Sequence, residues 1–216
     1  MAIYYASNFG TMRKKVGDGV TRRWRGLKVV AAYNPNPKNP QTDAQQTNRG
    51  KFGVLSEFAR CLASAIDTAM TYQLRNSKVF PRAWFMKANK GIVTPSGASY
   101  VVDYSSAKIS KGTLPGVLFG AASADNPGEV VVTFDSNEGV DGVSLTDRVY
   151  VAAYSPDTGM AVLSAPVARS AETLTLMVPL NWSGMQVHLW GFVLTPAAEV
   201  EVKVSDSVYL GSVTIN

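Results

Sequence analysis

The chain has 216 residues, of which 46% are hydrophobic and 17% are charged, and its formal net charge is +5 at pH 7. Average domains carry about 25% charged residues, so this composition indicates a globular chain with an unusually uncharged surface. Its single cysteine, Cys61, excludes an intramolecular disulfide framework. No apolar stretch reaches the roughly 18 residues of a membrane span, and the first residues lack the pattern of a secretory signal. We therefore expect a cytoplasmic protein, or part of a virion assembled in the cytoplasm, with no membrane partner.

The sign of the charge reverses along the chain. Residues 1–60 carry 11 Lys and Arg against 3 Asp and Glu, and residues 61–111 carry 7 against 2. Residues 112–216 carry 3 against 11. A cationic front half suits a polyanion such as nucleic acid. It equally suits the acidic half of a neighbouring copy, because contacts between unlike patches build rings or filaments.

Residues 1–41 are predicted to form a basic, extended arm that ends in a linker. The Asp18-Gly19 pair between Val16 and Val20 is a turn signal that favours a hairpin. Residues 21–33 are expected to be extended. The following segment has three prolines within six residues, which forbids a helix and favours a stiff linker.

Residues 42–98 are predicted to form a helical hairpin. The first helix is expected over residues 42–75, with Thr42 or Asp43 as its cap. Its apolar residues recur every three or four positions and form one stripe: Phe52, Leu55, Ala59, Leu62, Ile66 and Ala69. A shorter helix is expected over residues 81–89, because Pro81 suits a first turn and Gly91 suits a C-terminal stop.

Residues 99–216 are predicted to form an antiparallel Ig-like β-sandwich. Short apolar runs separated by turn signals recur about every 8–15 residues with no helix between them. The expected strands are residues 100–104, 116–119, 129–134, 148–154, 160–163, 172–178, 186–194, 200–204 and 208–215. Residues 187–194 are apolar on both faces, which is typical of a central strand.

The sequence offers little for catalysis. His188 is the single histidine, which excludes metal sites built from several histidines and relays between two imidazoles. It lies within a predicted strand, so a structural role is favoured over one in a Ser-His-Asp triad. Cys61 lies on the apolar side of the predicted helix, where it is expected to be a small buried hydrophobe. We predict no catalytic residue, no cofactor and no metal site, and a protein that is not an enzyme.

Two further groups of residues have more than one interpretation. The spacing of Asp135, Glu138, Asp141 and Asp147 does not fit the known calcium-loop pattern, so a solvated loop is favoured over a metal site. Trp182 and Trp190 are expected in the core. A weaker alternative is that the sandwich displays sugar- or surface-binding loops near these tryptophans.

The basic N-terminal segment is the strongest candidate for a functional site. It places six cations within 13 residues around an aromatic side chain, and a seventh cation follows: Arg13, Lys14, Lys15, Arg22, Arg23, Trp24, Arg25 and Lys28. Arginine beside an aromatic ring suits phosphates and bases. It also suits a protein interface, where Trp and Arg are common anchors. We favour the interface and keep nucleic-acid binding as the alternative.

One segment resembles a known family. The segment from Gly17 to Leu62, about 45 residues long, contains a set of short motifs at fixed spacing: Trp24-Arg25-Gly26, Val29-Val30, Asn39-Pro40-Gln41-Thr42, Ala44-Gln45-Gln46 and residues 49–52. This pattern is similar to the N-terminal signature of a domain-of-unknown-function family found in Bacteroidota and their phages, in which arginine commonly stands at the position of Gln41. The resemblance implies no catalytic residue and favours a phage-associated or self-assembling role.

The resulting expectation is an α+β protein with an extended basic arm, a helical hairpin and a C-terminal sandwich. We expect a structural subunit of a phage particle or a similar assembly, in which the arm contacts neighbouring copies or other subunits. The alternative is a cytoplasmic nucleic-acid-binding protein.

Overall fold

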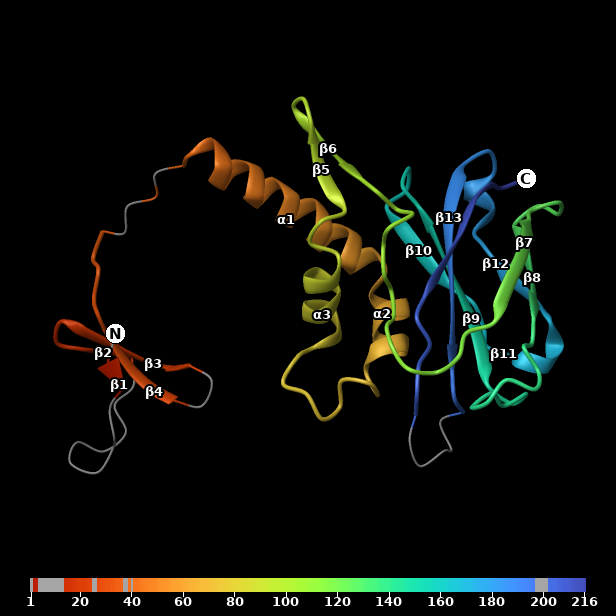
Figure 1. Cartoon of the computed structure of the whole chain (residues 1–216). Helices are drawn as coiled ribbons and strands as arrows, with labels where there is room; N and C mark the ends of the chain where they lie inside the picture. Colours follow the sequence, from red (N-terminus) through yellow and green to blue (C-terminus); the bar gives the residue numbers. More distant parts are fainter. Residues whose placement is uncertain (1, 4–13, 25–26, 37–38, 40, 197–201) are drawn as a thin grey trace. The chain divides into compact units, whose positions relative to one another are not determined.

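The computed structural model describes residues 2–3, 14–24, 27–36, 39, 41–196 and 202–216 (Figure 1). The chain divides into two compact units, Met1–Thr42 and Asp43–Asn216. The segment predicted as the arm, residues 1–41, falls within the first unit. The predicted helical hairpin (42–98) and sandwich (99–216) belong together to the second.

The described part of the first unit is a four-stranded antiparallel sheet with the order β1-β4-β3-β2. Its strands are β1 (Ala2–Ile3), β2 (Lys14–Val16), β3 (Gly19–Trp24) and β4 (Leu27–Ala32). The predicted hairpin is confirmed as β2-β3, but its turn is Gly17-Asp18 rather than Asp18-Gly19, because Val16 pairs with Gly19. Gly17 takes the left-handed conformation at this turn. The expectation of one extended stretch over residues 21–33 is wrong. The chain folds back so that Trp24 pairs with Leu27, which satisfies main-chain groups that a lone extended segment would leave to water.

Three helices open the second unit: α1 (Asp43–Cys61), α2 (Ala63–Met70) and α3 (Pro81–Ala88). The single helix predicted over residues 42–75 is broken at Leu62, although the buried stripe continues through both pieces. One member of the predicted stripe is exposed. Phe52 is 64% exposed, and Phe58, 3% exposed, packs in the core.

The rest of the second unit is built mainly of antiparallel strands, as expected from the sequence, with two short 3-10 helices at Arg169–Ala171 and Leu180–Trp182. A five-stranded sheet has the order β10-β9-β13-β14, with β11 paired to β9; a three-stranded sheet has the order β12-β8-β7; and β5-β6 is a separate hairpin. The strands are β5 (Val93–Ser96), β6 (Ser99–Val102), β7 (Leu118–Ser123), β8 (Glu129–Asp135), β9 (Arg148–Ser155), β10 (Met160–Leu163), β11 (Val167–Ala168), β12 (Thr173–Met177), β13 (Gln186–Leu194) and β14 (Val208–Thr214).

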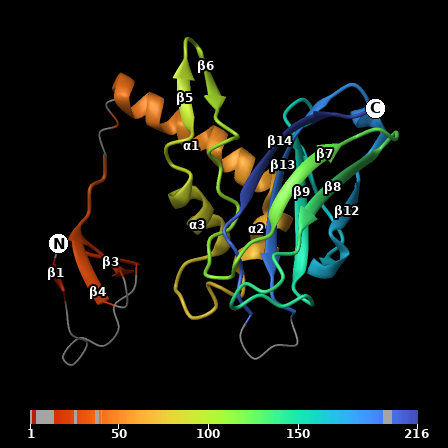
Figure 2. The same cartoon turned by 45° about the vertical axis from the view of Figure 1, so that its right-hand side comes forward.

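The second unit has three layers, with the five-stranded sheet in the middle (Figures 1 and 2). One face of β9 and β13 packs against the helices through Ala152, Tyr154, Trp190 and Phe192. The other face packs against the three-stranded sheet through alternate residues of the same strands. Because side chains alternate along a strand, a strand buried on both faces must be apolar throughout. This explains the apolar run that the sequence shows over residues 187–194, in which His188 is the one polar side chain.

Candidate functional site

The sheet of the first unit carries the predicted basic residues on three strands. Lys14 and Lys15 lie in β2, Arg22 and Arg23 in β3, and Lys28 in β4. The main chain of Trp24 ends β3. The predicted site residues Arg13 and Arg25 lie outside the described residues.

The strand register distributes these cations over both faces of the sheet. Arg23 lies directly opposite Lys28, and both share a face with Lys14, which is paired with Thr21. Arg22 and Lys15 belong to the other face, because neighbouring residues of a strand point to opposite sides. Like charges directly opposite each other destabilise a sheet. An anion beside Arg23 and Lys28 would relieve this repulsion.

Lys15 has an aromatic neighbour within the same unit. Its Nζ lies 3.9 Å from the centroid of the Tyr33 ring, in a cation–π contact. Such a contact contributes about 0.5–1 kcal/mol at an exposed site. The Tyr33 ring is 42% exposed, so it also offers an apolar surface beside the charge.

A second cationic surface lies in the second unit, in a groove of about 530 Å³ between α1 and α3. Its apolar lining comes from Phe52 and Leu55 of α1 and Met86 of α3. Three lysines and an asparagine complete the lining: Asn48, Lys51, Lys87 and Lys90. Of the described residues that line the groove, none is acidic. We call this feature the lysine groove.

The walls of the lysine groove are held at a fixed separation. Arg82 of α3 donates through Nη2 to the main-chain oxygen and the hydroxyl of Ser56 in α1, at 3.0 and 2.8 Å. Beneath this contact the rings of Phe58 and Phe85 meet edge to face, with centroids 5.8 Å apart. The groove is therefore a preformed feature of the helical layer.

The acidic residues between β8 and β9 form an exposed loop. Glu138, Val140 and Asp141 are exposed, and the side chain of Val140 is 50% exposed. Two consecutive turns shape the loop, because the Val140 N–H donates to Asn137 O and the Val143 N–H donates to Val140 O. Left-handed backbone at Asn137, Gly139 and Gly142 permits these turns. We call residues 137–143 the acidic loop.

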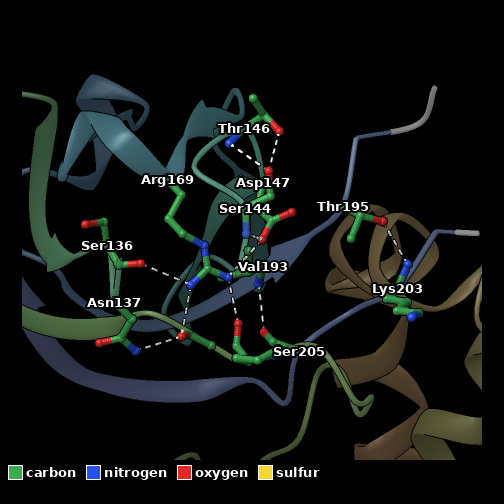
Figure 3. A network of polar contacts seen from close by, with 12 residues as sticks. Ser136, Asn137, Ser144, Thr146, Asp147, Arg169, Val193, Thr195, Lys203 and Ser205 are labelled. Carbon is green, nitrogen blue, oxygen red and sulfur yellow. Dashed lines mark hydrogen bonds and ion pairs between the residues drawn. The ribbon is translucent and has the colours of Figure 1, made fainter. Parts of the chain in front are cut away.

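A buried ion pair fixes the base of the acidic loop (Figure 3). Arg169 Nη2 lies 3.2 Å from Asp147 Oδ2, and the two side chains are 0% and 1% exposed. The guanidinium also donates to the carbonyls of Pro115, Gly116 and Ser136. Ser136 precedes the loop and Asp147 follows it, so Arg169 joins the two ends.

This arrangement corrects the sequence-based interpretation of Asp147. The sequence favours a solvated loop there, but the carboxylate is buried, forms an ion pair with Arg169 and accepts a hydrogen bond from the Ser144 N–H. Asp135 also has a local role, since its carboxylate caps the Asn137 N–H at 2.8 Å. Glu138 and Asp141 are exposed, as predicted.

His188 belongs to an aromatic cluster. Its Nδ1 lies 2.7 Å from the Tyr209 hydroxyl, and its ring centroid lies 4.2 Å from that of Tyr104. Burial lowers the pKa of His188 below its ordinary value of 6.5. Burial also raises the pKa of Tyr104 and of Tyr154. The imidazole is therefore neutral near pH 7, and the groups around it are un-ionised.

The surroundings of Cys61, Trp182 and Trp190 indicate a structural role for these residues. Cys61 is partly buried, and desolvation raises the pKa of its thiol, which disfavours the nucleophilic thiolate. Trp182 and Trp190 are each 0% exposed, which confirms the expectation that they lie in the core.

A second concave feature lies beside the β5-β6 hairpin. It has a volume of about 520 Å³ and is lined by Tyr104 and by residues of α1, β6 and β9, among them Glu57, Tyr100 and Tyr154. Glu57 already pairs with Arg60 on its own helix. The pocket is therefore mainly an apolar and aromatic hollow.

Two kinds of feature are absent from the described residues. No three His, Cys, Asp or Glu side chains there lie close enough together to hold a metal ion. None of the helices in that part of the chain combines the length and the apolar character needed to cross a bilayer.

The comparisons with known proteins are sparse. The profile of a family of unknown function, DUF6266, matches residues 11–211. No curated protein matches the sequence significantly. Among solved structures, the chain is similar to the fn3 domain of human collagen alpha-1(XX) chain, with 13% identity and a TM-score of 0.35. That match covers 47% of this chain and 86% of the collagen domain.

Proposed function

The chain belongs to DUF6266, a family of unknown function, and we propose that it is a non-enzymatic structural protein that assembles with copies of itself or with other subunits. The resemblance of its residues 17–62 to a signature found in Bacteroidota and their phages favours a phage particle as the assembly.

The separation of charge into distinct bodies carries this proposal. The first unit, residues 1–42, has 8 Lys and Arg against 1 Asp or Glu, a balance of +7. The second unit has 13 against 15, a balance of −2, and is itself divided. Its residues 43–111 carry 10 against 4 and its residues 112–216 carry 3 against 11. Copies with such opposed surfaces attract each other in an ordered, head-to-tail manner.

In this proposal the sheet of the first unit contacts the acidic sandwich of a neighbouring copy. The Arg23–Lys28 pair favours this contact, because an acidic side chain from the neighbour relieves the repulsion between the two cations. The same pair favours nucleic acid as the alternative partner, because phosphates would relieve the repulsion as well.

The test is to replace Arg22, Arg23 and Lys28 together by glutamine. If the partner is another subunit, sedimentation velocity at low salt should show weaker self-association than for the wild type. If the partner is nucleic acid, gel shifts should weaken for all sequences, and the salt slope should fall by roughly 0.7–0.9 for each phosphate that the variant no longer neutralises.

A matched control removes three cations elsewhere, at Arg75, Lys78 and Lys108, which are exposed in the second unit. This control should behave like the wild type in both assays. A wild-type protein that stays monomeric at high concentration and low salt, and binds no nucleic acid, would overturn both interpretations of the basic sheet.

A further inference from the structure

We propose that the lysine groove of one copy receives the acidic loop of a second copy. The inference rests on the proposed function, because it names one contact through which copies assemble. It concerns two features of the second unit, and variants of the groove test it without changing the basic sheet or the acidic residues that the sheet is proposed to contact.

The groove is suited to a ligand that is both apolar and anionic. Phe52 lines the groove and is 64% exposed, although it continues the stripe that is buried further along α1. Covering an exposed phenyl ring is favourable, at about 25 cal/mol per Å² of apolar surface removed from water. The same groove is also lined by three cations, Lys51, Lys87 and Lys90.

The acidic loop also combines apolar and charged groups, but its charges are negative where those of the groove are positive. Val140 stands exposed between Glu138 and Asp141, so an apolar side chain is flanked by two carboxylates. The turn hydrogen bonds and the Arg169–Asp147 pair hold the loop in place. Little conformational entropy is then lost when it binds, which favours association.

The position of the two features makes the contact intermolecular. The lysine groove belongs to the helical layer, and the acidic loop connects the other two layers, from β8 to β9 (Figure 1). The ion pair of Arg169 with Asp147 and its hydrogen bond to Ser136 O hold the loop beside the two sheets, away from the helices. A copy therefore cannot fill its own groove, and each copy offers one groove and one loop to its neighbours.

A contact between two different surfaces is heterologous, so it repeats from copy to copy and forms rings or open chains. One turn inserted into one groove makes a small interface, and interfaces below about 1,200 Å² are typically weak. We expect reversible, concentration-dependent association that weakens with salt.

Charge reversal in the full-length chain tests each side of the contact. Lys87→Glu with Lys90→Glu turns the groove acidic, and Glu138→Lys with Asp141→Lys turns the loop basic. Each double variant alone should raise the dissociation constant of self-association by about tenfold or more, because like charges then meet. Sedimentation equilibrium measures this constant, and circular dichroism checks that the variants are folded.

Mixing the two double variants provides the decisive measurement. The acidic groove of the first fits the basic loop of the second, and these two surfaces meet only in the mixture. An equimolar mixture should therefore associate more tightly than either double variant alone. A mixture that stays as weak as either variant alone overturns the inference.

A third variant separates docking from diffuse attraction between charges. Val140→Ser leaves every charge in place, so it should weaken association only if the side chain enters the groove. Control reversals at exposed residues outside both features, Arg75→Glu with Lys78→Glu and Asp125→Lys with Asp157→Lys, should leave association unchanged. If these controls weaken it as much as the groove and loop variants do, no specific docking exists.

The outcomes also distinguish this inference from the proposed function. A wild type that associates, together with groove and loop variants that associate equally well, overturns the docking contact but leaves assembly standing. A wild type that never associates overturns both. Gel shifts that weaken for Lys87→Glu with Lys90→Glu, while self-association stays unchanged, would assign the groove to nucleic acid instead.

Discussion

Arg169 and Asp147 are withdrawn from solvent almost completely, with exposures of 0% and 1%. Burying such a pair is costly, and removing one partner costs more because it leaves the other charge unpaired. The three main-chain carbonyls around the guanidinium compensate part of this cost. The ion pair therefore contributes to the stability of the fold and also fixes the two ends of the acidic loop.

Replacing Arg169 by alanine should lower the free energy of unfolding by about 3–5 kcal/mol, because Asp147 would then be buried alone. Urea unfolding measures the change. The exposed neighbour Arg148 serves as the control, and its replacement by alanine should change stability by about 0.5 kcal/mol or less. Equal effects of the two substitutions would contradict the role of the buried pair.

His188 should make the stability of the second unit dependent on pH. Its folded-state pKa is depressed below 6.5, so the unfolded chain takes up this proton at a higher pH than the folded chain does. The stabilisation is therefore fully present above pH 6.5 and is lost as the pH falls below it.

The variant His188→Gln should lack this dependence while keeping a polar group near Tyr209. The difference in urea midpoint between wild type and variant should accordingly shrink as the pH is lowered from about 7.5 to about 5.5. Midpoints that fall in parallel would show that His188 contributes nothing to the pH dependence. Under the proposed function, self-association of the variant should remain unchanged.

At the scale of elements, two glycines should respond to alanine with opposite signs. Gly53 lies inside α1, and apart from the adjoining backbone of its own helix nothing lies within 4 Å of an added Cβ, so Gly53→Ala should stabilise by about 0.5–1 kcal/mol. At Gly191 of β13 an added Cβ would lie 2.1 Å from the Phe119 ring. Displacing that ring should cost about 1–3 kcal/mol. Thermal unfolding gives both signs, and stabilisation by Gly191→Ala would contradict the packing described.

The elements that the sequence predicts well are those with a strong period. Residues 186–194 match β13 at both ends, because burial on two faces leaves a long apolar run. By contrast, β5 escapes prediction, since it is short and contains Pro95, which normally argues against a strand. The break between α1 and α2 at Leu62 has no glycine or proline to signal it. In the 200–204 segment, residues 200–201 lie outside the described residues and Val204 forms one bridge, to Leu194.

At the scale of the whole molecule, removing residues 1–42 should leave the second unit folded. Both hydrophobic clusters consist of residues from 43 onward. The truncated chain should unfold cooperatively at a temperature within a few degrees of the corresponding transition in the full-length protein. Differential scanning calorimetry makes the comparison. Loss of the transition would show that the sheet of the first unit supports the second.

The candidate surfaces are only partly visible in the sequence. The cations from Lys14 to Lys28 are apparent as a run, but their distribution over two faces depends on strand register. The lysine groove could not be predicted, because it joins Lys51 and Lys87 from separate helices. Arg169 carries no local signal either, since its partners come from other segments of the chain. Contacts between segments that are distant in the sequence produce no repeating pattern of residues from which they could be predicted.

The central position of β13 has a consequence for the way the second unit opens. Its main-chain amides pair with β9 on one side and β14 on the other, beneath side-chain layers on both faces. Hydrogen exchange at such amides requires the opening of the whole unit rather than a local fluctuation. The slowest exchange in the chain should therefore occur at residues 189–193, where the rate reports global stability. Amides of the acidic loop and the lysine groove can then exchange their hydrogens quickly at the surface, while the hydrogen bonds of this strand stay intact.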